Sequence, residues 1–106
     1  ERVLIRDGAR VQVIPVARID YVEAQDDYVA FFAEGRQWLK NQRMAELENQ
    51  LDPQAFLRVH RSYIVNLAAI ARIEPTGKDG HCAVLKSGAR IPISRSGYQK
   101  VRDLMR

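Results

Sequence analysis

The feature that most constrains the fold is a succession of short β-rich runs, each closed by turn-forming residues. Runs rich in Val, Ile, Tyr and Phe end at Gly, Pro, Asn or Asp, which is typical of strands joined by tight turns. The expected strands are residues 3–5, 10–14, 19–24, 28–33, 36–40, 63–65, 69–73, 83–85 and 90–93. The chain is therefore predicted to be mainly β, with short antiparallel sheets.

Two segments have helical spacing instead. Apolar residues recur at helical intervals over 44–51, with Asn41 as the expected N-cap. They recur again over 98–105, where Ser96 and Gln99 have the spacing of a capping box. We expect one small internal helix and one C-terminal helix. Because no linker-like stretch interrupts the chain, its 106 residues (1–106) are interpreted as a single domain. Since the chain begins at Glu1 without a methionine, we expect it to be the C-terminal part of a longer protein.

Composition excludes several classes of protein. No apolar run approaches the ~20 residues of a membrane span, so no membrane contact is expected. Cys82 is the single cysteine and cannot form an internal disulfide. A reducing compartment follows, and we expect the protein in the cytoplasm.

The distribution of charge predicts a polyanionic partner. Seventeen Lys and Arg against thirteen Asp and Glu give a formal net charge of +4. Residues 1–52 carry seven basic and ten acidic side chains, whereas residues 53–106 carry ten basic and three acidic ones. Thirteen of the cations are arginine, whose planar fork suits phosphates and guanine edges. Nucleic acid is favoured over an anionic membrane surface.

The sequence offers no catalytic machinery. His60 and His81 are the two histidines, and no nucleophile elbow, phosphate-binding loop or metalloprotease motif occurs. Asp26 and Asp27 are interpreted as a solvated loop, since neighbouring residues on a strand point to opposite faces and make a poor acid–base pair. His81 and Cys82 lack further ligands at metal-binding spacing. We expect no enzyme activity, no cofactor and no metal.

The most informative segment reads FLRVHRSYIVN, residues 56–66. His60, Arg61 and Ser62 interrupt two apolar groups, which predicts an exposed bend anchored by buried residues such as Phe56 and Val65. An arginine and a hydroxyl presented together can meet a base edge and a phosphate. His60 is either part of this surface or a hydrogen-bonded core imidazole, and Arg61 is either a contact or an ordinary surface cation.

A second polar step, Ser94-Arg95-Ser96, follows a predicted strand and precedes the C-terminal helix. A helix N-terminus offers backbone N–H groups to phosphate, so Arg95 and its neighbours are candidates for backbone contact. The alternative is that both serines are helix caps. Ser96 can serve in both roles.

These motifs carry a resemblance to a known family. FLRVHRSYIVN closely resembles the central signature of the LytTR domain, the DNA-binding module of the LytR/AlgR family of bacterial transcription regulators. YVEA at 21–24 followed by DYV at 27–29 is similar to the family's first DNA-facing loop. GR at 35–36, LENQL at 47–51 and IPISRS at 91–96 are similar to its hairpin, helix and closing strand-to-helix motif. The resemblance covers residues 2–106.

The resemblance implies an elongated fold of several antiparallel sheets that binds duplex DNA through inter-strand loops, in successive major grooves and the groove between them. The implied contact residues are Asp27, Tyr28, His60, Arg61, Ser62, Ser94, Arg95 and Ser96. Arg61 and Arg95 would read base edges, preferably of guanine, and the serines would position the backbone. Asp26 and Asp27 place negative charge in the first loop, where it repels phosphate.

The resemblance also implies partners. Family members join this module to a receiver domain of a two-component system or to a membrane sensor, and receiver phosphorylation would promote pairing of copies on direct-repeat DNA sites. The alternatives are a basic β module that binds RNA or an acidic protein. RNA readers present exposed aromatics on a sheet, and the eight aromatics here are expected mostly in the core. Lys78 is expected far from all three loops.

Overall fold

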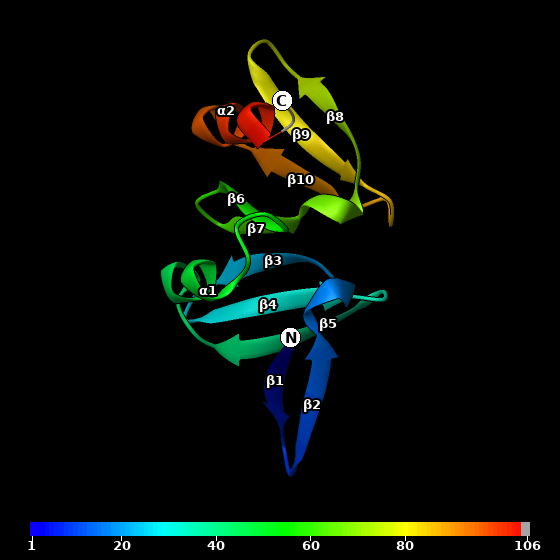
Figure 1. Cartoon of the computed structure of the whole chain (residues 1–106), viewed down its shortest axis with the longest axis vertical. Coiled ribbons are helices and arrows are strands. Elements are labelled where there is room, and N and C mark those ends of the chain that lie inside the picture. Colours follow the sequence, from blue (N-terminus) through cyan, green and yellow to red (C-terminus); the bar gives the residue numbers. More distant parts are fainter. Residues whose placement is uncertain (105–106) are drawn as a thin grey trace.

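The computed structural model describes residues 1–104, which form an elongated molecule of 47 × 24 × 24 Å (Figure 1). The strands are β1 (Arg2–Asp7), β2 (Arg10–Pro15), β3 (Ile19–Gln25), β4 (Tyr28–Ala33), β5 (Arg36–Asn41), β6 (Phe56–His60), β7 (Tyr63–Asn66), β8 (Ile70–Thr76), β9 (Gly80–Leu85) and β10 (Arg90–Ile93). The helices are α1 (Met44–Gln50) and α2 (Arg95–Leu104), and 3-10 turns cover Val16–Arg18 and Leu67–Ala69. The prediction of a mainly β chain with two helices is confirmed.

Three antiparallel sheets are stacked along the long axis (Figure 1). The N-terminal hairpin pairs β1 with β2. The central sheet has the order β5-β4-β3-β7-β6, and the C-terminal sheet has the order β10-β9-β8. Helix α1 lies beside the central sheet and α2 beside the C-terminal sheet, on the same side of the molecule (Figure 1).

Two hydrophobic cores cover the two faces of the central sheet. The first lies on the side of the N-terminal hairpin and α1 and includes Ile5, Val22, Phe31, Leu47, Phe56 and Ile64. The second lies on the side of the C-terminal sheet and α2 and includes Val59, Val65, Leu85, Ile91 and Val101. Phe56 is 5% exposed and Val65 is 0% exposed, so the expected burial of both is confirmed. They belong to different cores.

Residues 56–60 form a strand that the sequence reading had not assigned. β6 pairs with β7 through Phe56 opposite Asn66, with an irregularity between Arg58 and His60. The segment is therefore a β-hairpin whose turn contains Arg61 and Ser62. The strand lacks a simple polar–apolar alternation because both faces of the sheet are covered at this point.

Helix α1 begins later than its predicted cap. Asn41 is the last residue of β5, where it pairs with Tyr28, and it does not cap the helix. The backbone N–H of Arg43 donates to the carboxylate of Glu46 at 3.2 Å, the half of a capping box that a first-turn glutamate supplies. The predicted cap was wrong because the strand persists to Asn41. The apolar face predicted for the C-terminal helix includes Met105, which lies outside the described residues.

Asn66 is the one buried polar side chain in the part of the chain that the structure describes. Its Nδ2 donates to the carbonyl oxygen of Ile19 at 2.9 Å, and its Oδ1 accepts from the N–H of Ala68 at 3.0 Å. The amide thus joins the end of β7 to the start of β3 and caps the turn that follows. All of this polarity is satisfied, as a buried amide requires.

Candidate nucleic-acid interface

The three polar segments singled out from the sequence lie at the same end of their strands. The turn between β3 and β4 and the turn between β6 and β7 are neighbours, because the N–H of Ala24 donates to the carbonyl of Ser62 at 2.9 Å. The start of α2 is joined to β6 by a bond from the N–H of Ser94 to the carbonyl of Val59, also 2.9 Å. Figure 1 shows both helices on this side as well.

The turn between β6 and β7 holds its backbone firmly and leaves Arg61 exposed. Arg58 donates from Nε and Nη2 to the carbonyl oxygen of Arg61, at 3.2 and 2.6 Å. The same guanidinium forms an ion pair with Glu48 of α1 at 3.2 Å. Arg58 was not among the residues singled out from the sequence. Its bonds fix the turn from which the Arg61 side chain projects.

His60 braces the same turn. It is half-buried, and its Nδ1 accepts a hydrogen bond from the N–H of Ser62 at 3.1 Å. This bond requires an unprotonated Nδ1, so the neutral ring carries its proton on Nε2. The ring also packs edge-on against Tyr63, with centroids 5.6 Å apart. His60, the last residue of β6, thus supports the turn through Nδ1, and within residues 1–104 its Nε2 makes no hydrogen bond. It is neither a fully buried core imidazole nor a fully exposed surface residue.

Tyr63 connects the turn to the neighbouring strand. Its hydroxyl donates to the carboxylate of Glu23 on β3 at 3.1 Å. Burial, together with this hydrogen bond and the charge of Glu23, raises the pKa of Tyr63 above its usual value. The phenol therefore stays protonated and continues to donate at any physiological pH.

The turn between β3 and β4 places Asp26 and Asp27 at its tip, both exposed. Asp26 has a φ of 55°, the left-handed region that Asp tolerates better than most residues. The backbone conformation of the turn is therefore enough to explain an aspartate at position 26, without any ligand. Tyr28 is the first residue of β4 and is 45% exposed, so its ring is available to a partner.

Ser94, and not Ser96, caps α2. The Oγ of Ser94 accepts from the N–H of Gly97 at 3.0 Å, and its carbonyl accepts from the N–H of Tyr98 at 2.8 Å. The prediction from Ser96 and Gln99 was wrong because the helix already begins at Arg95. Arg95 and Ser96 therefore lie in the first turn of the helix, where both are exposed.

Gly97 is a positioning residue that the sequence reading missed. A Cβ built on it would lie 2.6 Å from the carbonyl carbon and 2.9 Å from the Cα of Val59, and closer still to the carbonyl oxygen. Glycine therefore permits α2 to lie directly against β6, which sets the position of Arg95. A glycine early in an amphipathic helix was the available signal.

Most of the aromatic residues lie in the two cores or pack against them, as expected, and the partly buried ones include Tyr21, Trp38, Tyr63 and Tyr98. Of those in residues 1–104, Phe31 and Phe56 are buried and Tyr28 is exposed. Tyr21 and Phe32 stack face to face with centroids 4.3 Å apart. These half-buried rings pack against each other instead of forming an open row for base stacking.

Lys78 was expected far from the three segments, whereas its turn lies at the same end of the C-terminal sheet as the third segment. Its turn joins β8 to β9 at the end where His81 pairs with Ile93, which immediately precedes Ser94. Lys86, in the turn between β9 and β10, lies at the opposite end of β9. It is the better charge control for this surface.

Within residues 1–104, no helix is long and apolar enough to cross a membrane. The same part of the chain contains no group of three or more His, Cys, Asp or Glu arranged to hold a metal ion.

Comparison with known proteins identifies the family. The family model of the LytTr DNA-binding domain matches residues 9–106, and the chain belongs to the LytTR family. A solved structure of a LytTr DNA-binding domain from Bacillus cereus superposes with a TM-score of 0.88 at 28% identity, covering 98% of this chain and 95% of that one. The resemblance read from the sequence and the elongated β fold are thereby confirmed.

Curated relatives are bacterial regulators. The chain is 32% identical over 103 residues to the transcriptional regulatory protein YpdB of Escherichia coli K12, covering 96% of this chain and 42% of that protein. It is 34% identical over 100 residues to the CO-responsive transcriptional regulator RcoM of Rhodospirillum rubrum, covering 92% and 42%. It is 26% identical over 98 residues to the sensory transduction protein LytT of Bacillus subtilis, covering 92% and 41%. The chain thus spans about two fifths of these relatives, and its family is one of DNA-binding regulator domains, not of enzymes.

Proposed function

We propose that this domain recognises specific sequences in duplex DNA through three inter-strand segments, as the output module of a bacterial transcription regulator in the cytoplasm. The observation that carries the proposal is the side-by-side arrangement of the three polar segments, joined by the Ala24–Ser62 and Ser94–Val59 hydrogen bonds. The contact residues proposed are Asp27, Tyr28, His60, Arg61, Ser62, Ser94, Arg95 and Ser96.

Arg61 and Arg95 are proposed to read bases. Both are exposed on backbone that the fold holds in place, Arg61 by Arg58 and Arg95 by the Ser94 cap. An arginine fork donates two parallel hydrogen bonds to O6 and N7 of guanine in the major groove. The domain is 47 Å long, more than the ~34 Å of one DNA turn. The three segments lie side by side on this domain and are proposed to enter neighbouring grooves of the duplex.

The serines and His60 are proposed to contact the backbone. The Oγ of Ser94 is already engaged with Gly97 and Val59, which leaves it a positioning role more than a direct one. Ser96 is exposed in the first turn of α2, where a phosphate also meets free N–H groups. The Nε2 proton of His60 can be donated to a phosphate oxygen.

Partners follow from the relatives named as regulators. We propose that the full-length protein contains a receiver or sensor domain, and that copies bind adjacent direct repeats. The chain spans about two fifths of relatives such as YpdB and LytT, which leaves room for such a domain.

The test compares single variants on a site selected from random duplex DNA. Arg61→Ala and Arg95→Ala are each expected to weaken specific binding by about 1–3 kcal/mol while leaving the melting temperature nearly unchanged. Binding to random duplex should weaken much less, since one cation is lost there. Lys86→Ala is the charge control, measured by fluorescence anisotropy at equal salt.

Three results would contradict the proposal. A loss for Lys86→Ala as large as that for Arg61→Ala would mean that bulk charge, and not the site, determines affinity. Tighter binding of RNA or single strands than of duplex DNA at equal salt would favour the RNA alternative, and no salt-dependent binding of any nucleic acid would favour an acidic protein partner.

A further inference from the structure

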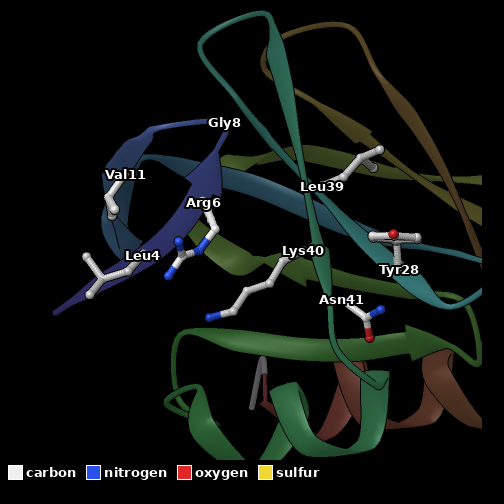
Figure 2. Close-up of a pocket in the computed structure, with 8 residues that line it drawn as sticks. All are labelled: Leu4, Arg6, Gly8, Val11, Tyr28, Leu39, Lys40 and Asn41. Carbon is white, nitrogen blue, oxygen red and sulfur yellow. The ribbon is translucent and has the colours of Figure 1, made fainter.

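A hollow of about 650 Å³ lies beside the edge strand β5, next to the N-terminal hairpin. It is lined by Arg6 from β1, Tyr28 from β4, and Leu39, Lys40 and Asn41 from β5, among others (Figure 2). Tyr28 is a proposed DNA contact, and the other residues of the hollow have no role in the function described above.

Two cations converge in this hollow. Figure 2 shows the guanidinium of Arg6 and the ammonium of Lys40 pointing toward the same space between β1 and β5. No carboxylate lines the hollow, and within residues 1–104 neither cation forms an ion pair. Like charges held together repel, and an anion between them removes that repulsion. The arrangement fits a bound anion.

The hollow adjoins the turn between β3 and β4. Tyr28 directly follows that turn, and it pairs across the sheet with Asn41, so both ends of the pair line the hollow. Lys40, the residue before Asn41, points to the other side of β5 from Tyr28 (Figure 2), but both side chains line this one hollow at the edge of the sheet.

The charge of the β3–β4 turn explains why cations beside Tyr28 would help DNA to bind. The turn itself carries Asp26 and Asp27, which repel phosphate, and it has no cation of its own. A DNA backbone approaching Tyr28 needs positive charge from another element. Arg6 is exposed and comes from a sheet that packs against β5, far from Tyr28 in sequence, and it supplies that charge together with Lys40.

We propose that Arg6 and Lys40 bind a backbone phosphate of duplex DNA beside the Tyr28 turn, which extends the interface onto the N-terminal hairpin. This inference rests on the proposed function. Leu4 and Val11 border the hollow and are each 56% exposed, a surface that would also suit an acidic, apolar protein segment. The position beside Tyr28 favours DNA.

The test uses duplex DNA of random sequence, about three helical turns long, because phosphate contacts do not depend on sequence. The variant is Arg6→Gln with Lys40→Gln, which keeps much of each alkyl stem in place. Its matched control is Arg18→Gln with Lys86→Gln, which removes one arginine and one lysine at the opposite ends of β3 and β9. Affinity is measured by anisotropy across a series of salt concentrations, and melting temperatures verify folding.

The Arg6/Lys40 variant is expected to reduce the steepness of log K against log[salt] by about 1 to 2, and to lower affinity in 0.1 M salt by about tenfold. The Arg18/Lys86 control should change both much less. Equal effects of the two variants, or wild-type binding by the Arg6/Lys40 variant, would overturn the inference. The hollow would then be better explained as a binding surface for an acidic, apolar protein segment. Failure of the wild-type domain to bind duplex DNA is a separate result, which overturns the proposed function itself.

Discussion

Replacing Gly97 by alanine tests how closely α2 lies against β6. In most helices this change stabilises by about 1 kcal/mol, because alanine has the higher helix propensity. Here the new Cβ would lie 2.6 Å from the carbonyl carbon of Val59, well inside van der Waals contact, and the Val59 atoms that it meets are all backbone atoms. The helix must move away from the strand.

The expected cost follows from two opposing effects. Overpacking of this kind costs about 1–3 kcal/mol. Movement of α2 also weakens the bonds from Ser94 N–H and Oγ to the carbonyl of Val59, at 2.9 and 3.2 Å, each worth about 1 kcal/mol. After subtraction of the propensity gain, Gly97→Ala should destabilise the domain by about 2 kcal/mol, which lowers the melting temperature by about 10 °C.

Thermal and urea unfolding, followed by circular dichroism, measure this cost. Lys100→Ala is the control, because Lys100 is exposed on the same helix and its replacement should change stability by less than about 0.5 kcal/mol. Since Arg95 moves with the helix, Gly97→Ala should also weaken DNA binding below the melting transition. A variant as stable as the wild type, or more stable, would refute the close approach of α2 to Val59.

Two further predictions concern the core and a carboxylate. Phe56→Ala should lower the free energy of unfolding by about 3–5 kcal/mol, because Phe56 is only 5% exposed and lies in the first core. Calorimetry should then find the domain largely unfolded, and normal melting would contradict the described packing. Burial, and then the nearby charge of Glu34, raise the pKa of Asp20, so its carboxylate destabilises the folded state at neutral pH. Asp20→Asn should therefore raise the melting temperature at pH 7, with the gain disappearing as pH falls below about 4, and a gain independent of pH would exclude this cause.

Local patterns predicted the strands best where one face of a sheet is solvated or a tight turn closes the run. Strands 28–33 and 90–93 were predicted with the bounds of β4 and β10. The strand at 56–60 was missed because Phe56 enters one core and Val59 the other, which removes the polar–apolar alternation. The predicted start of α2 was wrong because Ser94 and Ser96 are both suitable N-cap residues, and only the structure shows that Ser94 is the cap.

The candidate site was predicted as three segments because each combines exposed polar residues with a strand end. What the sequence could not provide is the set of contacts made by packing. Arg58 holds the Arg61 carbonyl, and Gly97 accommodates the Val59 carbonyl, through pairings between separate elements. The convergence of Arg6 and Lys40 depends on how the N-terminal hairpin packs beside β5, which no local pattern encodes.

The buried amide of Asn66 has a consequence for folding errors. In the central sheet, Val22 and Ile64 face one core while Val65 faces the other, so a one-residue slip of β7 would exchange faces and still find apolar surroundings. The amide of Asn66 would not find suitable surroundings, because a slip breaks its hydrogen bonds to Ile19 and Ala68. A buried polar group left without a partner costs about 1–3 kcal/mol. The Asn66 amide therefore disfavours mispaired forms of the β6–β7 hairpin, although it lies at the end of β7 far from Arg61. By fixing the register of β7, it helps to place Arg61 in the turn.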